Sequence, residues 1–216
     1  MMKKIIPFIL SATLILVSCG QEKTNDQDKT KIGIESATFH YDRGRDYLKK
    51  GQDDQAIFEF NKAIEIDPEY AEAYYVLGVV YGKLGRYQEA VESFKQTIRI
   101  KPDYAEASYF LGVAYGKLGR YQEAIQAYKW SICIKPDYAE AHFMLGVAYS
   151  DLRHYQEAIQ AYKQAIRFKP DCAEAHYNLG MLYWMLRDQS SALGEYKILK
   201  DLDRNLASQL FNLIYK

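Results

Sequence analysis

The chain has 216 residues, of which 49% are hydrophobic and only five are proline, so it can bury a sizeable core and is not a disordered polymer. Its 28 basic and 28 acidic residues cancel, which excludes the strongly basic surface of a nucleic-acid-binding protein. The twenty tyrosines are unusual, and tyrosine suits both helix packing and wet binding surfaces because it joins an apolar ring to a polar hydroxyl.

The segment 1–18 has the pattern of a secretory signal peptide. A basic start at residues 1–4 precedes an apolar run over 5–17 that is too short to span a bilayer comfortably. The run ends in Leu-Val-Ser-Cys at residues 16–19, and this tetrapeptide resembles the lipobox of bacterial lipoproteins. The resemblance implies that the Cys19 thiol is lipidated and that the leader is cut just before it. The alternative is a simple cleaved leader with an incidental cysteine.

Residues 19–36 are predicted to form a flexible tether. They are polar and charged and carry no hydrophobic period, so they favour a solvated linker between the lipid anchor and a folded domain. Gly20 is not the aspartate that retains enterobacterial lipoproteins at the inner membrane. We therefore expect an envelope location, on the periplasmic face of the outer membrane if the cell has two membranes.

From residue 37 the sequence repeats itself at a fixed interval. The motif Tyr-Ala-Glu-Ala begins at Tyr70, Tyr104 and Tyr138, and Cys172 begins its last copy. A Leu-Gly pair begins at Leu77, Leu111, Leu145 and Leu179, and a proline closes units at Pro68, Pro102, Pro136 and Pro170. This pattern resembles the tetratricopeptide repeat. The resemblance implies an all-α fold, a right-handed α-solenoid of five helical hairpins over 37–70, 71–104, 105–138, 139–172 and 173–206.

The residue types agree with that architecture. Gly78 and Ala90 are small where the two helices of a hairpin cross closely, and Gly85 and Gly119 suit the turn between helices. Pro102 is expected to end the second helix, because the residue before a proline is biased away from helical geometry. A single hairpin cannot bury its apolar face, so the hairpins must stack.

The two ends of the array depart from the repeat as caps do. The first unit places charged residues where later units have apolar or neutral ones: Asp42, Arg43 and Asp46. The last unit has Arg204 in place of the proline. Apolar residues then recur at helical spacing, and they predict a capping helix over 207–216: Leu206, Leu210, Leu213 and Ile214.

The resemblance implies that the first helix of each hairpin lines a concave groove. The matching positions form the predicted partner-binding set: Tyr75, Val79, Tyr109, Val113, Phe143, Val147, Tyr177, Met181 and Trp184. These residues are aromatic and aliphatic, so they do not match the basic clamp with which chaperone-binding members hold a carboxylate. We expect a groove for an apolar or amphipathic protein segment. The alternative, that the tyrosines only shape the groove, stays open.

No pattern indicates catalysis, a cofactor or a metal. His40, His142 and His176 share one repeat position, but equivalent residues of neighbouring repeats lie about 10 Å apart, too far for shared zinc ligation at about 2 Å. Packing histidines are the favoured interpretation. Cys133 and Cys172 occupy different repeat positions and do not resemble a disulfide framework, although their redox state is an open question.

The predicted function is that of a membrane-anchored protein–protein interaction adaptor or assembly factor in the bacterial envelope. The expected partners are a protein or peptide in the groove and the membrane through Cys19, with no nucleic acid. The alternative is a structural homo-oligomer in which the apolar groove packs against another copy.

Overall fold

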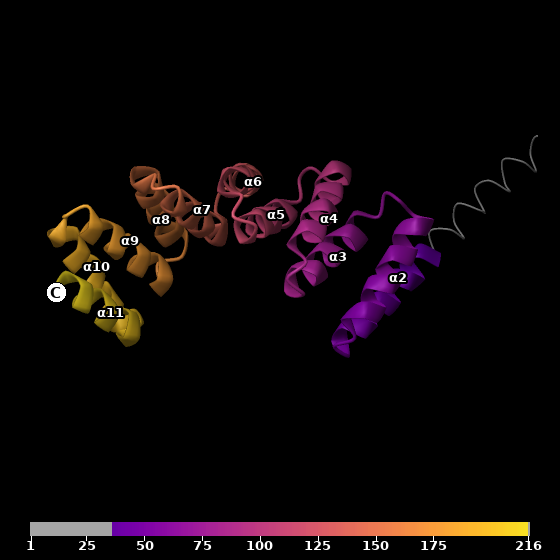
Figure 1. Cartoon of the computed structure of the whole chain (residues 1–216), viewed down its shortest axis with the longest axis horizontal. Coiled ribbons are helices and arrows are strands. Elements are labelled where there is room, and N and C mark those ends of the chain that lie inside the picture. Colours follow the sequence, from indigo (N-terminus) through magenta and orange to yellow (C-terminus); the bar gives the residue numbers. More distant parts are fainter. Residues whose placement is uncertain (1–35, 216) are drawn as a thin grey trace, which may run out of the picture. The chain divides into compact units, whose positions relative to one another are not determined.

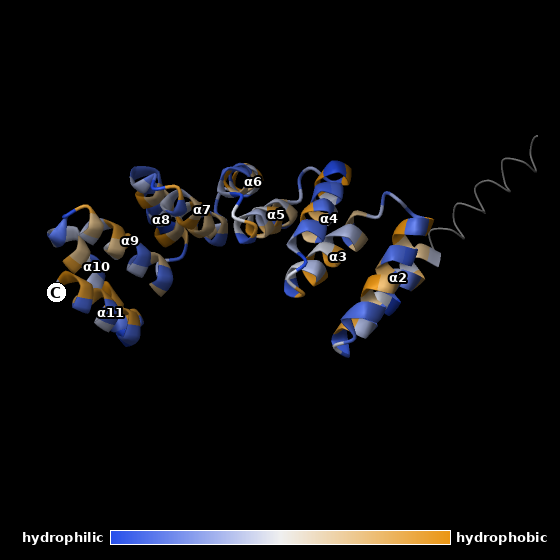
Figure 2. Ribbon diagram, in the orientation of Figure 1, coloured by the Kyte–Doolittle hydropathy of each residue, from blue (hydrophilic) through white to orange (hydrophobic). Residues whose placement is uncertain are grey.

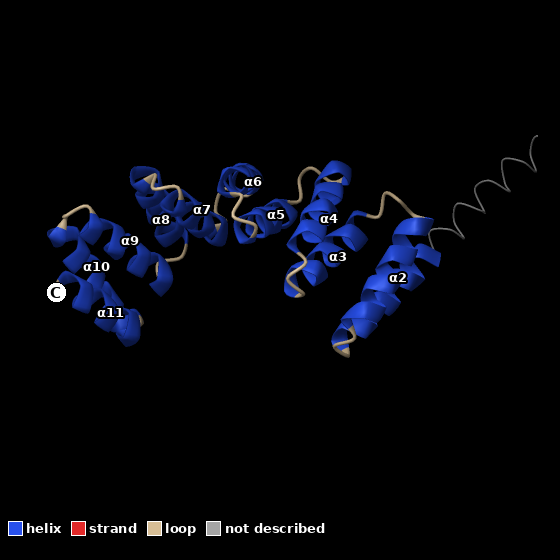
Figure 3. Cartoon of the chain, in the orientation of Figure 1, coloured by secondary structure: helices blue, strands red, loops and turns tan. Residues whose placement is uncertain are grey.

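The computed structural model describes residues 36–215, which form eleven helices and no strand (Figures 1 and 3). A first helix covers residues 36–49. It is followed by α2 Asp53–Ile66, α3 Ala71–Lys83, α4 Tyr87–Ile100, α5 Ala105–Lys117, α6 Tyr121–Ile134, α7 Ala139–Asp151, α8 Tyr155–Phe168, α9 Ala173–Met185, α10 Gln189–Leu202 and α11 Arg204–Ile214. The predicted all-α fold of consecutive hairpins with a final helix is confirmed. The predicted signal peptide, Cys19 and nearly all of the tether lie outside the described residues.

The chain divides into two compact units, Met1–Ala73 and Tyr74–Lys216. In the described part of the first unit, the helix over 36–49 pairs with α2, and the Phe60 ring is fully buried between them. In the second unit, a continuous core runs from α4 to α8, and smaller clusters follow over α8–α9 and α10–α11. Figure 2 shows the corresponding bands of hydrophobic residues along the paired helices.

Each of the first four hairpins is closed by an aromatic ring of its second helix lying over a glycine of its first. A Cβ atom added to Gly78 would lie 2.8 Å from the Phe94 ring, and one added to Gly146 would lie 2.6 Å from the Tyr162 ring. Gly44 with Phe60 and Gly112 with Tyr128 repeat the arrangement. The small residue is therefore required by the close approach of the two helices, as the sequence predicted for Gly78.

The turns between the helices of a hairpin use a left-handed backbone. Gly85 (φ 74°) and Gly119 (φ 72°) adopt it as predicted, and Gly51 (φ 71°) does the same in the first unit. The last two hairpins place Arg153 (φ 60°) and Arg187 (φ 65°) at this position. For a non-glycine residue this conformation costs roughly 1–2 kcal/mol. The repeat pattern does not predict that cost.

The histidines at the shared repeat position are packed within their hairpins. His142 is buried, with its Nε2 2.9 Å from the Pro136 carbonyl oxygen. His176 lies in the same way against the Pro170 carbonyl at 3.1 Å, and its Nδ1 is 2.6 Å from Glu195 Oε2. This hydrogen bond to Glu195 raises the pKa of His176 above its ordinary value. The interpretation as packing histidines is confirmed for these two residues.

The C-terminal helix closes the last hairpin differently from the rest. It spans Arg204–Ile214 and so begins before the predicted residue 207, because Asp203 caps its start by accepting hydrogen bonds from the backbone N–H groups of Asn205 (2.8 Å) and Leu206 (3.0 Å). Leu210 of this helix, rather than Tyr196 of α10, lies over Gly180. Leu210 and Ile214 are buried, so α11 covers the apolar end of the array as a cap.

Two further features bear on the environment of the chain. Cys133 is exposed and Cys172 is partly buried, and both are free thiols. Partial burial raises the pKa of the Cys172 thiol. Within residues 36–215, none of the helices combines the length and the hydropathy needed to cross a bilayer.

Substituting glycines at matched places tests the ring-over-glycine contact. We expect Gly146→Ala to destabilise the fold by about 1–3 kcal/mol, because its methyl group overlaps the Tyr162 ring. Gly82→Ala is the control: nothing lies within 4 Å of its added Cβ, so this helical substitution should stabilise by about 0.5–1 kcal/mol. Thermal unfolding followed by circular dichroism measures both. Equal effects of the two substitutions would contradict the packing argument.

Candidate functional site

The nine predicted groove residues all lie on first helices of the second unit, α3, α5, α7 and α9. None of them is buried, and Val79 and Trp184 are 37% exposed. The first helices therefore present these side chains at an accessible surface. How much each side chain can contribute to binding a partner depends on how far it is already packed against other residues of the chain.

The tyrosines of the set are partly used in packing between hairpins. Tyr75 stacks on Tyr104, the residue before α5, with ring centroids 4.8 Å apart, and Tyr109 lies 5.1 Å from Tyr138, the residue before α7. Partial burial raises the pKa of Tyr75 to about 12 and that of Tyr138 to about 12. Their hydroxyls are therefore protonated at neutral pH. These rings act as a structural ladder and stay partly exposed.

Two pockets lie next to this ladder and are built by equivalent residues of successive hairpins. The α5–α7 pocket has a volume of about 180 Å³ and is lined by Val113, Gly116, Lys117, Tyr121, Ala124, Tyr128, Met144, Val147, Ala148 and Asp151. The α7–α9 pocket, of about 500 Å³, is lined by Val147, Ser150, Asp151, Arg153, Tyr155, Tyr162, Asn178, Met181, Leu182 and Met185. Apart from Ala124 and Arg153, every lining residue of one pocket has its counterpart one repeat away in the other.

Val147 and Asp151 of α7 line both pockets. Because one helix contributes the same two side chains to neighbouring pockets, the pockets form one row rather than two unrelated hollows. The predicted residues Val113, Val147 and Met181 are thereby brought together along it. Val79 and Trp184 line neither of these two pockets.

The two pockets differ in polarity at equivalent places. The α5–α7 pocket has Gly116, which carries no side chain, at the position where the α7–α9 pocket has Ser150. The Ser150 hydroxyl lies 2.9 Å from the Gly146 carbonyl oxygen and 3.4 Å from the Tyr162 hydroxyl. Burial raises the pKa of Tyr162, so this hydroxyl is also protonated at neutral pH. The larger pocket therefore offers hydroxyl and amide groups beside an apolar wall.

Arg153 adds a cation to the α7–α9 pocket from a strained backbone. It is one of the two non-glycine residues with a positive φ among the described residues, and it lines the pocket. Glycine occupies the equivalent position 119. An outlier of this kind at a pocket is an indication of function, because a less costly residue is available in the same chain.

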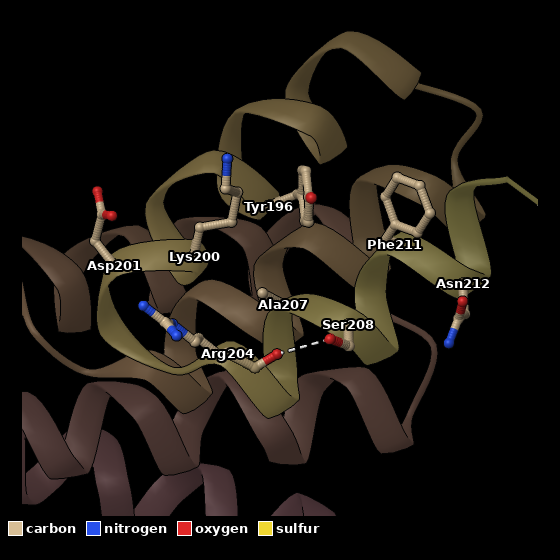
Figure 4. Close-up of a pocket in the computed structure, with 8 residues that line it drawn as sticks. All are labelled: Tyr196, Lys200, Asp201, Arg204, Ala207, Ser208, Phe211 and Asn212. Carbon is tan, nitrogen blue, oxygen red and sulfur yellow. Dashed lines mark hydrogen bonds between the residues drawn. The ribbon is translucent and has the colours of Figure 1, made fainter.

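A third pocket, of about 490 Å³, lies between α10 and α11 (Figure 4). The close-up shows the rings of Tyr196 and Phe211 on one side and the basic groups of Lys200 and Arg204 on the other. The Ser208 hydroxyl donates a hydrogen bond to the Arg204 carbonyl oxygen at 2.9 Å. Phe211 follows Tyr177 by one repeat length, so the aromatic position of the first helices continues into α11.

Several pocket residues were not predicted from the sequence. Phe211 falls within the predicted cap, and its place one repeat length after Tyr177 is the signal that assigns it to the aromatic series. Asn178 and Asp151 line the larger pocket and were not singled out. Arg153 stands one repeat length after the turn glycine Gly119, and this replacement is the sequence signal for a strained turn, although it does not show that the residue lines a pocket.

Comparison with protein families agrees with this geometry. The family described as TPR repeat matches residues 44–85, 117–152 and 154–186, and the one described as tetratricopeptide repeat matches 71–104. The chain belongs to the tetratricopeptide repeat family. This family consists of protein–protein interaction scaffolds rather than enzymes, and the accessible first-helix pockets fit that role. No curated protein sequence matches the chain.

Solved structures share the fold. A crystal structure of MamA is 30% identical, with a TM-score of 0.75 over 81% of this chain and 95% of that one. TTC0263 of Thermus thermophilus is 25% identical, with a TM-score of 0.59 over 83% and 100% of the two chains. YrrB, described as a TPR protein with an unusual peptide-binding site, is 23% identical, with a TM-score of 0.73 over 88% and 97%. At that identity the likeness to YrrB concerns the fold alone.

Glycine substitution at the two strained turns separates backbone strain from pocket function. We expect Arg153→Gly and Arg187→Gly each to raise the free energy of unfolding by about 1 kcal/mol, because glycine adopts the left-handed conformation without a Cβ clash. Thermal unfolding measures this gain. A loss of stability in Arg153→Gly alone would show that its side chain makes compensating contacts in the pocket.

Proposed function

We propose that this tetratricopeptide repeat scaffold is a lipid-anchored adaptor of the bacterial envelope. Its row of pockets over α5, α7 and α9 holds an apolar or amphipathic segment of another protein. The observation that carries the proposal is the pair of equivalent pockets that share Val147 and Asp151. A segment that fills one pocket with an apolar side chain continues along the row toward the next.

A protein segment fits these pockets better than an enclosed small molecule. The pockets are open and lie in sequence, and their walls combine apolar side chains with hydroxyl, amide and charged groups. Such a surface suits recognition of an extended or helical segment through several anchors. The shared fold with YrrB supplies a precedent for a peptide site on this architecture, although its peptide site is a property of that protein.

Arg153 and Trp184 are proposed to select the segment at the C-terminal half of the row. Arg153 forms no ion pair with another described residue, so its guanidinium is available to an acidic side chain beside an apolar anchor. Trp184 and Met185 are exposed on α9, and Met185 lines the pocket together with Met181. Tryptophan and arginine are enriched among the interface residues that carry most of the binding energy.

Anchoring through Cys19 rests on the Leu-Val-Ser-Cys motif at residues 16–19. Lipidation would hold the adaptor at a membrane, since each buried methylene contributes about 0.8 kcal/mol. The mature chain would then present its pockets close to the lipid surface, on the periplasmic face of the outer membrane in a cell with two membranes.

A structural homo-oligomer is the second candidate. It is favoured by exposed apolar side chains at the C-terminal end of the second unit: Ile198, Leu202, Phe211 and Tyr215. A second copy could cover these residues. Light scattering after size exclusion separates the two proposals, because an adaptor without partner elutes as a monomer.

Site-specific photo-crosslinking in the native host tests the adaptor proposal. With p-benzoylphenylalanine at Met181 in the full chain, we expect one discrete adduct heavier than the monomer, because this residue lines the pocket. The same probe at Lys95, which is exposed on α4 outside the pockets, is the matched control. Adding Trp184→Ala should lower the adduct yield about tenfold without changing the unfolding temperature, since Trp184 is 37% exposed.

The mass of the adduct distinguishes the candidates. An adduct of one chain with a different protein supports the adaptor, and an adduct of twice the chain mass supports self-association in which the groove packs against another copy. Equal adducts from Met181 and Lys95, or an unchanged yield in Trp184→Ala, would contradict the groove assignment.

Cys19→Ser tests the anchor independently of the groove. We expect the wild-type chain to incorporate a labelled fatty acid and to sediment with membranes, whereas the variant loses both properties because it lacks the acceptor thiol. Fatty-acid labelling followed by membrane fractionation measures this. Labelling that persists in the variant would overturn Cys19 as the lipidated residue and leave the pocket proposal untouched.

A further inference from the structure

We propose a second binding site, separate from the row of pockets, that takes a planar ring bearing one hydrogen-bonding group, such as a phenol or an imidazole. This Ser108 pocket has a volume of about 460 Å³ and lies between α4, α5 and α6. It is lined by Ile98, Ser108, Leu111, Tyr115, Glu123, Gln126, Ala127 and Trp130. It shares no lining residue with the α5–α7 or α7–α9 pocket.

The pocket arises where one hairpin lacks a ring that its neighbours carry. Ser108 stands at the repeat position that holds Tyr74, His142 and His176 in the other hairpins of the second unit. His142 and His176 are buried there, and the His142 ring stacks on Phe168 with centroids 5.5 Å apart. Serine is far smaller than either ring, so this position carries less bulk than in the neighbouring hairpins, and the pocket lies beside it.

Trp130 of the second helix replaces the missing ring's hydrogen bond. In the neighbouring hairpins an imidazole Nε2 lies against the carbonyl oxygen of Pro136 or Pro170. In this hairpin the Trp130 indole N–H donates to the equivalent carbonyl of Pro102 at 3.3 Å. The indole remains 50% exposed and forms one wall of the pocket, whereas glutamine stands at its equivalent positions 96 and 164.

The Ser108 hydroxyl has an unmet hydrogen-bonding requirement. Ser108 is completely buried, and its Oγ is the only buried side-chain nitrogen or oxygen among residues 36–215 without a hydrogen-bond partner. A buried polar group left unpaired costs about 1–3 kcal/mol. A ring that displaces the side chains closing off this Oγ and brings its own hydroxyl or ring nitrogen against it supplies the missing partner, because a serine hydroxyl can donate or accept.

The remaining wall agrees with a ring of this kind. Ile98, Leu111 and Ala127 are aliphatic, and Tyr115 and Trp130 offer aromatic faces. Glu123 and Gln126 are the polar side chains of the lining besides Ser108, and Arg120 already pairs with Glu123 at 2.7 Å. The site thus selects a mainly apolar, uncharged ring with one polar group, which the histidines of the neighbouring hairpins resemble in shape.

Nuclear magnetic resonance of the full chain in detergent micelles tests the proposal with p-cresol as the probe. The chain has two tryptophans, Trp130 in this pocket and Trp184 on α9, so their two indole N–H signals report separately. We expect p-cresol to shift the Trp130 signal saturably and to leave Trp184 unchanged. Toluene, which lacks the hydroxyl, should bind at least fivefold more weakly.

Two variants separate the space from the hydroxyl. Ser108→His places the neighbours' ring in the pocket and should abolish the Trp130 shift. Ser108→Ala keeps the pocket and removes the hydroxyl, so p-cresol and toluene should then bind with equal affinity. This comparison can be measured even if Ser108→His fails to fold. A p-cresol shift that is absent in the wild type, or that persists in folded Ser108→His, overturns the site. Equal wild-type affinities for p-cresol and toluene overturn the role of the hydroxyl.

A capped tripeptide with a central tyrosine identifies the source of the ring. If it shifts the Trp130 signal with an affinity comparable to that of p-cresol, the pocket accepts a tyrosine side chain of a partner protein. If p-cresol binds and the tripeptide does not, the ligand is a free small ring of the same chemistry.

Discussion

The contact on which the structure depends is the aromatic ring of the second helix lying over a glycine of the first, which recurs in the first four hairpins. A single added carbon at Gly112 or Gly146 would overlap the Tyr128 or Tyr162 ring, so the two helices approach as closely as a bare backbone allows. This approach sets the rotation of each first helix, because its glycine must face the ring. The opposite face of the helix is then presented in the same way in every repeat, and equivalent residues of successive hairpins can build equivalent pockets.

The features that recur in every repeat could be predicted from the sequence, because they depend on local geometry that is the same in each hairpin. The hairpins, the turn at Gly85 and the helix end before Pro102 belong to this class. The predicted groove residues lie on the first helices, yet the pairing of Tyr75 with Tyr104 was not foreseen. Whether a side chain is free or already occupied depends on contacts between hairpins, which the repeat pattern alone does not contain.

The departures from the period are more informative than the period itself, since each repeat serves as an internal control for the others. Arg153 retains a strained turn where Gly119 has none, and its side chain reaches a pocket. Ser108 carries less bulk than His142 one hairpin later, and a pocket lies beside it. Leu210 of α11, rather than Tyr196 of α10, covers Gly180. Because of this contact α11, which stands where the first helix of a further hairpin would begin, packs on the last hairpin as a cap. In each case the residue that departs from the repeat makes a structural difference that the equivalent residue of a neighbouring hairpin does not make.

Stacked repeats are stabilised mainly by contacts between neighbours, so a ligand that touches two hairpins acts on the interface that holds them together. α7 contributes Val147 and Asp151 to the pockets on both of its sides. A segment that occupies both pockets would therefore bridge the interfaces of α7 with α5 and with α9, and its binding energy would add to their stacking energy. Binding of a partner along the row of pockets would thus stabilise the stacking of the central hairpins. The Ser108 pocket, in contrast, is confined to the contact of α4 with α5 and α6.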